Sequence, residues 1–188
     1  NSGVDLDTAA RTMTVNVTSV NDAPVNTVPG AQGTAHNTPL VFSAGNGNAI
    51  TVADADAGAG LLQVTLSATN GSVLVGPVVG AASITGDGTA TVTITGSAGD
   101  VNSALSGMSF TPTLGYSGAG SLQIVTNDQG NTGAGGPLSD SDTVAVTVAN
   151  NVPASVSMTA STLSYAENDS ATPVDPNLTV GDPDSALL

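Results

Sequence analysis

The chain has no cysteine and no tryptophan, and one basic side chain, Arg11, stands against 15 acidic ones. The absence of cysteine excludes disulfide bonds, thiolate chemistry and most zinc sites. A net charge of -14 excludes nucleic acid as a partner, because phosphate binding requires clustered lysine and arginine. It also argues against an anionic membrane surface, and no apolar run approaches the ~20 residues of a membrane span. If the protein is secreted, something other than disulfides must stiffen it.

Few residues offer catalytic chemistry. His36 is the single histidine, and no nucleophile-elbow sequence is present. The glycine-rich residues 130–136 lack the Gly-Lys-Ser/Thr of a phosphate-binding loop. Two aspartates can serve as a glycosidase pair, but such enzymes use aromatic sugar platforms, and the chain has 2 Tyr, 2 Phe and no Trp. We therefore expect no enzymatic activity.

The chain repeats itself at a spacing of about 130 residues, which indicates tandem copies of one module. The matching segments are 5–8 with 140–143, 21–24 with 150–153, and 50–56 with 178–184. The phase of the repeat predicts the end of one module at 1–20, a complete module at 21–150 and the start of a third at 151–188. We therefore expect the chain to be part of a longer protein.

Short β-branched segments predict strands in the complete module. In 62–66, 91–95 and 144–148, aliphatic residues alternate with polar ones that are mostly threonine, so each segment has one apolar face. Further short apolar segments lie at 40–42, 50–52, 72–75 and 122–125. Turn sequences separate them, namely Asn70-Gly71, Asp87-Gly88 and 130–136. About seven or eight short strands with such turns predict an all-β fold, an antiparallel sandwich.

One segment departs from this pattern. Residues 100–105 are compatible with a helical turn, with Ser97 or Asp100 as its cap and Val101 and Leu105 facing the core. The apolar residues that follow are expected to close that end of the sandwich; they are Met108, Phe110 and Leu114.

Four carboxylates of the complete module fall in predicted loops that alternating strands can bring to one end: Asp22, Asp54, Asp56 and Asp128. Without lysine or arginine nearby they would repel one another, so they are either spread apart in water or held by a cation. Oxygen ligands without histidine or cysteine favour Ca²⁺ over a transition metal. The alternative is that these residues simply form turns and hydrogen-bond their own backbone. Because Asp-x-Asp recurs beside a recurring Asn-rich joint, we favour calcium.

In their order along the chain, these segments resemble a cadherin-type repeat. The segments are 20–24 (VNDAP), 54–56 (DAD), 126–130 (TNDQG) and 139–143 (SDSDT) before a Val/Thr strand. More closely, the whole chain resembles the cadherin-like tandem repeats of very large bacterial surface adhesins and other type I secreted, RTX-type proteins. The resemblance implies tandem Greek-key sandwiches of the cadherin-like or immunoglobulin-like kind, with Ca²⁺ bound where consecutive modules meet.

The resemblance also implies the ligands. Those at the first joint would be Asn21, Asp22, Asp54, Asp56 and Asp128, and those at the second joint Asn150, Asn151, Asp182 and Asp184. Glu167 corresponds to the family's early glutamate, whereas the complete module has His36-Asn37 at that place. Asn151 replaces the joint aspartate, so we expect about one or two ions at the second joint. For four further residues, a ligand role and a solvated turn both stay open: Asp5, Asp7, Asp140 and Asp142.

These features predict a calcium-stiffened spacer in a large secreted, cell-surface repeat protein, most simply a bacterial adhesin. Its partners would be the neighbouring repeats of the same chain, and this segment would not enter a membrane. One alternative is a self-assembling extracellular fibre or surface layer, in which modules contact like molecules laterally. A second is a ligand-binding accessory module of a secreted enzyme. The sequence does not identify an adhesive target.

Overall fold

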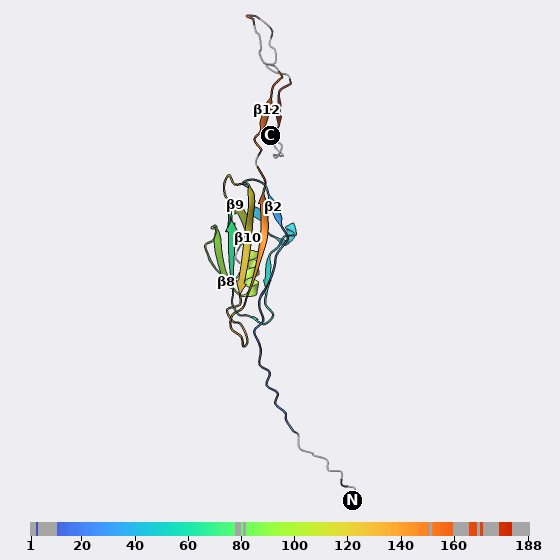
Figure 1. Cartoon of the computed structure of the whole chain (residues 1–188), viewed down its shortest axis with the longest axis vertical. Helices are drawn as coiled ribbons and strands as arrows, with labels where there is room; N and C mark the ends of the chain where they lie inside the picture. Colours follow the sequence, from blue (N-terminus) through green and yellow to red (C-terminus); the bar gives the residue numbers. More distant parts are fainter. Residues whose placement is uncertain are drawn as a thin grey trace.

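The computed structural model describes residues 3, 11–77, 80, 82–150, 152–159, 166–168, 170 and 177–181. These residues form a mostly β, sandwich-like structure, so the all-β prediction is confirmed (Figure 1). The connector before residue 25 enters the sandwich at one end, and the chain leaves toward β12 at the opposite end (Figure 1).

The larger sheet has 6 strands in the order β2-β11-β10-β5-β8-β7. In that order they are Gln32–Thr34, Ser139–Val148, Gly118–Asn127, Leu62–Thr69, Thr91–Gly96 and Ser83–Thr85. Neighbouring strands are antiparallel except for β2 and β11, which run parallel. The strands β5, β8 and β11 contain the three alternating segments, because alternation gives each strand one apolar face to bury, and β10 contains the short apolar segment 122–125.

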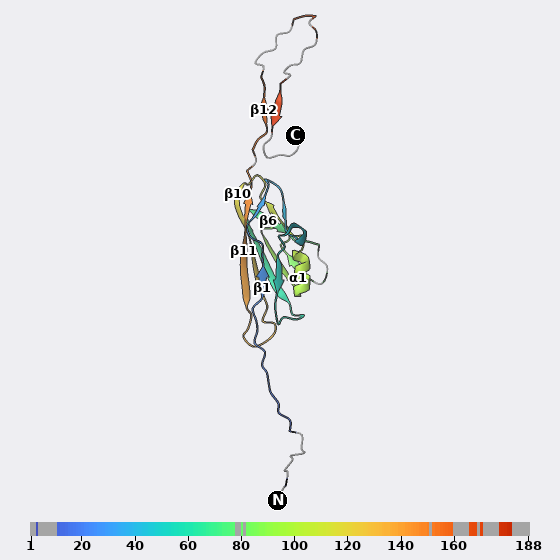
Figure 2. The ribbon, with the colours of Figure 1, turned by 90° about the vertical axis from the view of Figure 1, so that its right-hand side faces the viewer.

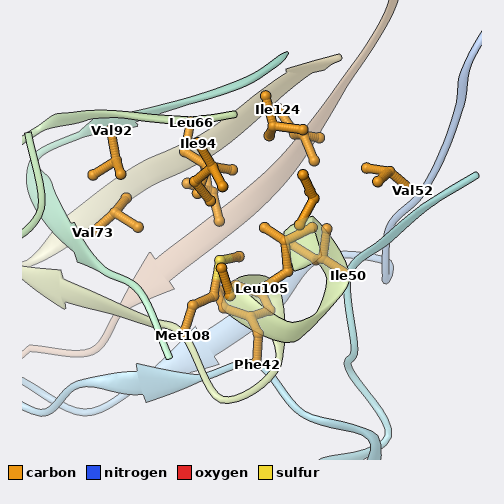
Figure 3. Close-up of a cluster of buried hydrophobic side chains, with 14 of the residues drawn as sticks. Phe42, Ile50, Val52, Leu66, Val73, Val92, Ile94, Leu105, Met108 and Ile124 are labelled. Atoms are coloured by element: carbon orange, nitrogen blue, oxygen red, sulfur yellow. The ribbon is translucent and has the colours of Figure 1, made fainter. Parts of the chain in front are cut away.

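The smaller strands lie across the core from this sheet. One group has the order β3-β9-β6, and β1 pairs with β4. Their bounds are Leu40–Val41 (β3), Ser109–Pro112 (β9), Gly71–Leu74 (β6), Val25–Thr27 (β1) and Thr51–Ala53 (β4), with a 3-10 turn at Ala44–Asn46. Buried side chains such as Val52 and Val73 from these strands and Leu66, Ile94 and Ile124 from the larger sheet form one apolar cluster (Figure 3).

The one α-helix among the described residues is α1, Ala98–Leu105. Ser97 is its N-cap and accepts a hydrogen bond from the backbone N–H of Asp100, and Val101 and Leu105 are buried, as predicted. The helix contacts β4, β5 and β8 and lies on the side of the sandwich away from β11 (Figure 2).

Of the three apolar residues expected to close one end of the sandwich, two are buried in the core. Met108 and Phe110 are fully buried. The expectation for Leu114 is wrong, because its side chain is 86% exposed. It lies in a tight turn between β9 and β10, where the backbone N–H of Tyr116 donates to the carbonyl of Thr113, and this turn points the Leu114 side chain into solvent.

A second, smaller strand pair follows the sandwich. Strand β12, Ser155–Ser157, pairs antiparallel with β13, Thr179–Gly181. The pair has the same length and sense as β1 with β4, and Ser155 lies opposite Gly181 as Val25 lies opposite Ala53. In both pairs the second strand leads directly into an Asp-x-Asp sequence.

None of the helices among the described residues is long and apolar enough to cross a membrane.

Candidate cation site

Three loops meet at the end of the sandwich where the chain enters. They are the connector before β1, the turn after β4 and the loop between β10 and β11. The backbone N–H of Asp22 donates to Asp56 Oδ2 at 3.2 Å, and Thr132 Oγ1 donates to the carbonyl of Asp56 at 2.7 Å. Asn21 Nδ2 donates to Asp128 Oδ2 at 2.5 Å across 107 residues of sequence. The three loops therefore carry the five residues predicted for the first joint to one end of the sandwich, although Asp22 is exposed and makes its contact through its backbone N–H.

The turn after β4 is organised by the side chain of Asp54. Its Oδ1 accepts hydrogen bonds from the backbone N–H of Asp56 at 3.1 Å and of Ala57 at 3.0 Å. An aspartate that binds the backbone two and three residues ahead forms a turn of its own. This accounts for one of the two oxygens of Asp54 and leaves the other free for a different role.

Three oxygens at this end of the sandwich are buried without a hydrogen-bond donor: Asn21 Oδ1, Asp54 Oδ2 and Asp56 Oδ1. Asn21 itself is only 5% exposed. Buried polar atoms are nearly always paired, and leaving an acceptor dry and unpaired costs free energy. Three such acceptors on adjoining segments, two of them on carboxylates, form the environment that a bound cation would satisfy.

The charge state of Asp54 fits the same environment. Burial raises the pKa of the Asp54 carboxyl above its ordinary value, the two backbone hydrogen bonds oppose this rise, and the nearby Asp56 side chain adds to it. Asp54 and Asp56 thus share one turn, in which burial disfavours the charged form of Asp54. A divalent cation would relieve the repulsion between the two carboxylates.

The chemical types of the possible ligand atoms determine which cations can bind. Among the described residues, no three Asp, Glu, His or Cys side chains gather closely enough to hold a metal by themselves. Calcium, however, accepts amide and carbonyl oxygens and water alongside carboxylates, whereas zinc sites are usually built on histidine or cysteine. The Asn21 amide and the carboxylates of Asp54 and Asp56 match the preferences of calcium.

Asp128 is fully buried and its carboxylate is already occupied by hydrogen bonds. Oδ1 accepts from the backbone N–H of Gly130 and of Leu138, each at 2.8 Å, while Oδ2 accepts from the Asn21 amide. Burial alone would raise the pKa of Asp128, but these hydrogen bonds outweigh it and the pKa is lowered. Asp128 therefore fastens the β10–β11 loop and holds the Asn21 side chain so that Oδ1 is left without a donor.

Asp140 also has a hydrogen-bonding role that sequence reasoning did not foresee. Its Oδ2 accepts from the backbone N–H of Asn26 at 2.7 Å, and its Oδ1 accepts from the backbone N–H of Ser141 at 2.8 Å. Asn26 is buried and accepts a hydrogen bond from Thr126 Oγ1. These contacts tie β1 to β10 and β11 just inside the candidate site.

Three further predicted ligands among the described residues lie outside the first site. Asp142 lies on β11 opposite Ile124, and Asn150 and Glu167 are exposed. Five of the predicted residues lie outside the described residues: Asp5, Asp7, Asn151, Asp182 and Asp184.

A side chain of α1 holds the strand that leads into the site. Asn102 Oδ1 accepts from the backbone N–H of Val52 at 2.8 Å, and Asn102 Nδ2 donates to the Val52 carbonyl at 2.9 Å. The amide thus makes both hydrogen bonds that a neighbouring strand would make to Val52, two residues before Asp54. A lone asparagine in a helix carries no sequence signal of this role, because its partner is 50 residues away.

Replacing Asn102 with alanine should destabilise the sandwich by about 1–3 kcal/mol, because two backbone groups of Val52 lose their partner. Urea denaturation of the chain measures this loss. The control is Asn46→Ala, which removes an exposed amide that donates one hydrogen bond, to the Val41 carbonyl. An equal loss in the two variants would show that the Asn102 amide holds β4 no more firmly than an exposed side chain would.

No protein-family model matches the chain, and no curated protein matches it. The function is therefore argued from the geometry of the site and from the repeat.

Proposed function

We propose that residues 21–150 are a calcium-stiffened spacer module of a large secreted, cell-surface repeat protein, as in bacterial adhesins. The module would be a Greek-key sandwich of the cadherin-like or immunoglobulin-like kind. Its partners would be the preceding and following modules of the same chain, and its cofactor Ca²⁺. The observation that carries this proposal is the set of three buried, donor-free oxygens on Asn21, Asp54 and Asp56.

The site would stiffen the chain because its ligands come from two kinds of segment. Asn21 belongs to the connector that enters the module, whereas Asp54 and Asp56 belong to a turn of the sandwich. An ion shared by these residues ties the connector to the sandwich. When the ion is absent, the two carboxylates repel each other.

Calcium binding at such a joint would depend on whether the protein is inside or outside the cell. Extracellular calcium modules bind at ~10⁻⁴–10⁻³ M, so their sites are empty in the cytosol and filled outside. A chain without cysteine, stiffened by an ion that is abundant outside the cell, suits export before folding. Exposed threonine on the large sheet and the net charge of -14 would keep a long array soluble and discourage pairing between strand edges.

The repeated strand pair supports an array of such joints. Strands β12 and β13 reproduce β1 and β4 in length and sense, and the sequence after β13 again contains Asp-x-Asp. A spacer needs this regular arrangement, with each connector followed by the same strand pair and the same acidic turn.

The absence of cysteine allows a direct test of stiffness. Spin labels on Thr12→Cys, in the connector, and Thr143→Cys, on the exposed face of β11, report the distance between connector and sandwich. We expect the distance distribution to narrow when Ca²⁺ replaces a chelator, and the narrowing to disappear when Asp54→Asn and Asp56→Asn are combined.

The control for this experiment is Asp87→Asn, which removes one charge from an exposed turn outside the site. It should keep the calcium response. An unchanged distribution under millimolar Ca²⁺ in the parent chain would refute the spacer. Calcium-driven polymerisation in sedimentation, without narrowing, would favour the fibre or surface layer instead.

A further inference from the structure

The loop between β10 and β11 contacts the incoming connector through its backbone. The N–H of Ala134 donates to the Ser19 carbonyl at 2.9 Å, and the N–H of Asn21 donates to the Ala134 carbonyl at 3.0 Å. Val20 and Ala134 thereby form a parallel β-bridge. These hydrogen bonds involve only main-chain groups, so they require no ion.

The loop is itself fastened to the sandwich on its other side. Asn131 Nδ2 donates to the carbonyls of Leu61 and Asp128, at 3.0 and 2.8 Å. Thr132 Oγ1 donates to the Asp56 carbonyl. Connector, loop and sandwich are therefore joined in series, and the loop also contacts the turn that carries Asp54 and Asp56.

Gly133 makes the close approach of loop and connector possible. A Cβ at this position would lie 2.6 Å from the backbone nitrogen of Asn21 and 2.7 Å from the carbonyl carbon of Val20. These neighbours are backbone atoms and cannot give way as a flexible side chain would. Gly133 also has a φ of +148°, a conformation that residues with a side chain rarely adopt.

We infer that residues 129–136 form a main-chain clasp that holds the connector at Ser19–Asn21 without metal and positions Asn21 for the cation. The metal-free contact stands by itself, whereas the positioning of Asn21 for a cation deepens the proposed function and rests on it. The clasp and the site share Asn21, whose N–H is bound by Ala134 while its side-chain Oδ1 is free. Coupling between two such events is reciprocal, so a bound cation strengthens the clasp by the factor by which the clasp strengthens cation binding.

The inference predicts where the joint bends when calcium is removed. Because the clasp holds residues 19–21 against the sandwich, the first freely rotating part of the connector lies before Ser19. We expect the closed state of the clasp to predominate. Opening breaks only the few hydrogen bonds between loop and connector, so the clasp should open more readily than the core unfolds.

Amide hydrogen exchange on the whole chain tests this, with Gly133→Ala as the decisive variant. In chelator, the amides of Asn21 and Ala134 should exchange on the order of ten-fold more slowly than in an unstructured peptide. Adding Ca²⁺ should slow them further. In Gly133→Ala this protection should disappear in chelator and the Kd for Ca²⁺ should rise by a similar factor, while core amides such as those of Val64 and Ile94 stay protected.

Gly135→Ala is the matched control. Gly135 has a similar φ of +137°, but a Cβ there would lie 3.8 Å from its nearest neighbour, the Cβ of Asn21. This variant carries the same backbone strain without the steric clash, so the clasp should survive in it. Equal loss of protection in both variants would assign the effect to loop strain and overturn the clasp.

The two proposals fail in different ways. Unprotected Asn21 and Ala134 amides in chelator, in a chain that still binds Ca²⁺, would refute the clasp and leave the spacer standing. Protected amides in a chain that binds no Ca²⁺ would refute the calcium site and the positioning of Asn21, and would leave the metal-free contact standing. Protection that is unchanged in Gly133→Ala would show that Gly133 is not what permits the contact.

Discussion

Saturating Ca²⁺ should raise the midpoint of thermal unfolding by about 10 °C, and Asp56→Asn should remove most of this increase. A ligand at about a hundred times its Kd stabilises the folded state by about 2.7 kcal/mol, which in a domain of this size corresponds to a shift of several degrees or more. The physical reason is that the ion supplies charge to three oxygens that have no donor. Calorimetry of the chain in Ca²⁺ and in chelator measures the shift.

Two controls make this result specific. Asp87→Asn removes an equal charge from an exposed turn and should leave the calcium shift intact. Mg²⁺ should stabilise less than Ca²⁺, because it demands octahedral geometry and gives up its water reluctantly. If calcium leaves the midpoint unchanged, or if Asp87→Asn reduces the shift as much as Asp56→Asn does, the site on Asn21, Asp54 and Asp56 is wrong.

Replacing Asp128 with alanine should destabilise the folded chain by about 3 kcal/mol or more, even in chelator. Hydrogen bonds to a charged group contribute about 1.5–3 kcal/mol each, and the variant leaves the N–H groups of Gly130 and Leu138 and the Asn21 amide without their acceptor. Urea denaturation at neutral pH measures the loss. Asp87→Ala, which removes an exposed acceptor for the N–H of Val75, should cost about 1 kcal/mol or less.

The pH dependence of this effect has a definite sign. Because the pKa of Asp128 is lowered in the folded protein, its contribution is fully present above the pKa of an unfolded aspartate. It is lost as the pH falls through the lower, folded value. The difference between parent and Asp128→Ala should therefore be constant at neutral pH and shrink in acid. A difference of less than about 1 kcal/mol at neutral pH would show that the loop does not depend on the carboxylate.

Part of the secondary structure followed from local patterns, whereas the short strands β1, β2, β7 and β9 were not among the predicted segments. Alternating Val and Thr in β5, β8 and β11 predicted one buried face for each strand, because side chains of a strand point to opposite faces in turn. The sequence offered Ser97 or Asp100 as the cap of a helical turn, and the structure has Ser97 as the N-cap of α1, because its side chain can bind one of the first free N–H groups. Leu114 was misjudged because a turn residue has no fixed periodicity, so its direction depends on the turn itself.

The candidate site was only partly visible in the sequence. Asp-x-Asp after a strand and an Asn-rich joint marked Asn21, Asp54 and Asp56 as candidates because both features recur. The same reasoning treated Asp128 as one more ligand candidate and left a ligand role open for Asp140. In the folded chain both oxygens of each of these two carboxylates accept hydrogen bonds from the protein. Carboxylates that bind an ion and carboxylates that bind backbone N–H groups look alike in a sequence.

The sequence by itself determined the mostly β character of the protein and the approximate position of its helix, because these depend on composition and on neighbours a few residues apart. Only the tertiary structure decided which polar atoms meet. Asn21 reaches Asp128 across 107 residues, Asn102 reaches Val52 across 50, and Thr132 reaches Asp56 across 76. Such pairs carry no local pattern, since they exist only after the sheet has brought its loops to one end. The buried side-chain oxygens of Asn21, Asp54 and Asp56 that have no hydrogen-bond donor also became apparent only in the tertiary structure, because burial is a property of the folded chain.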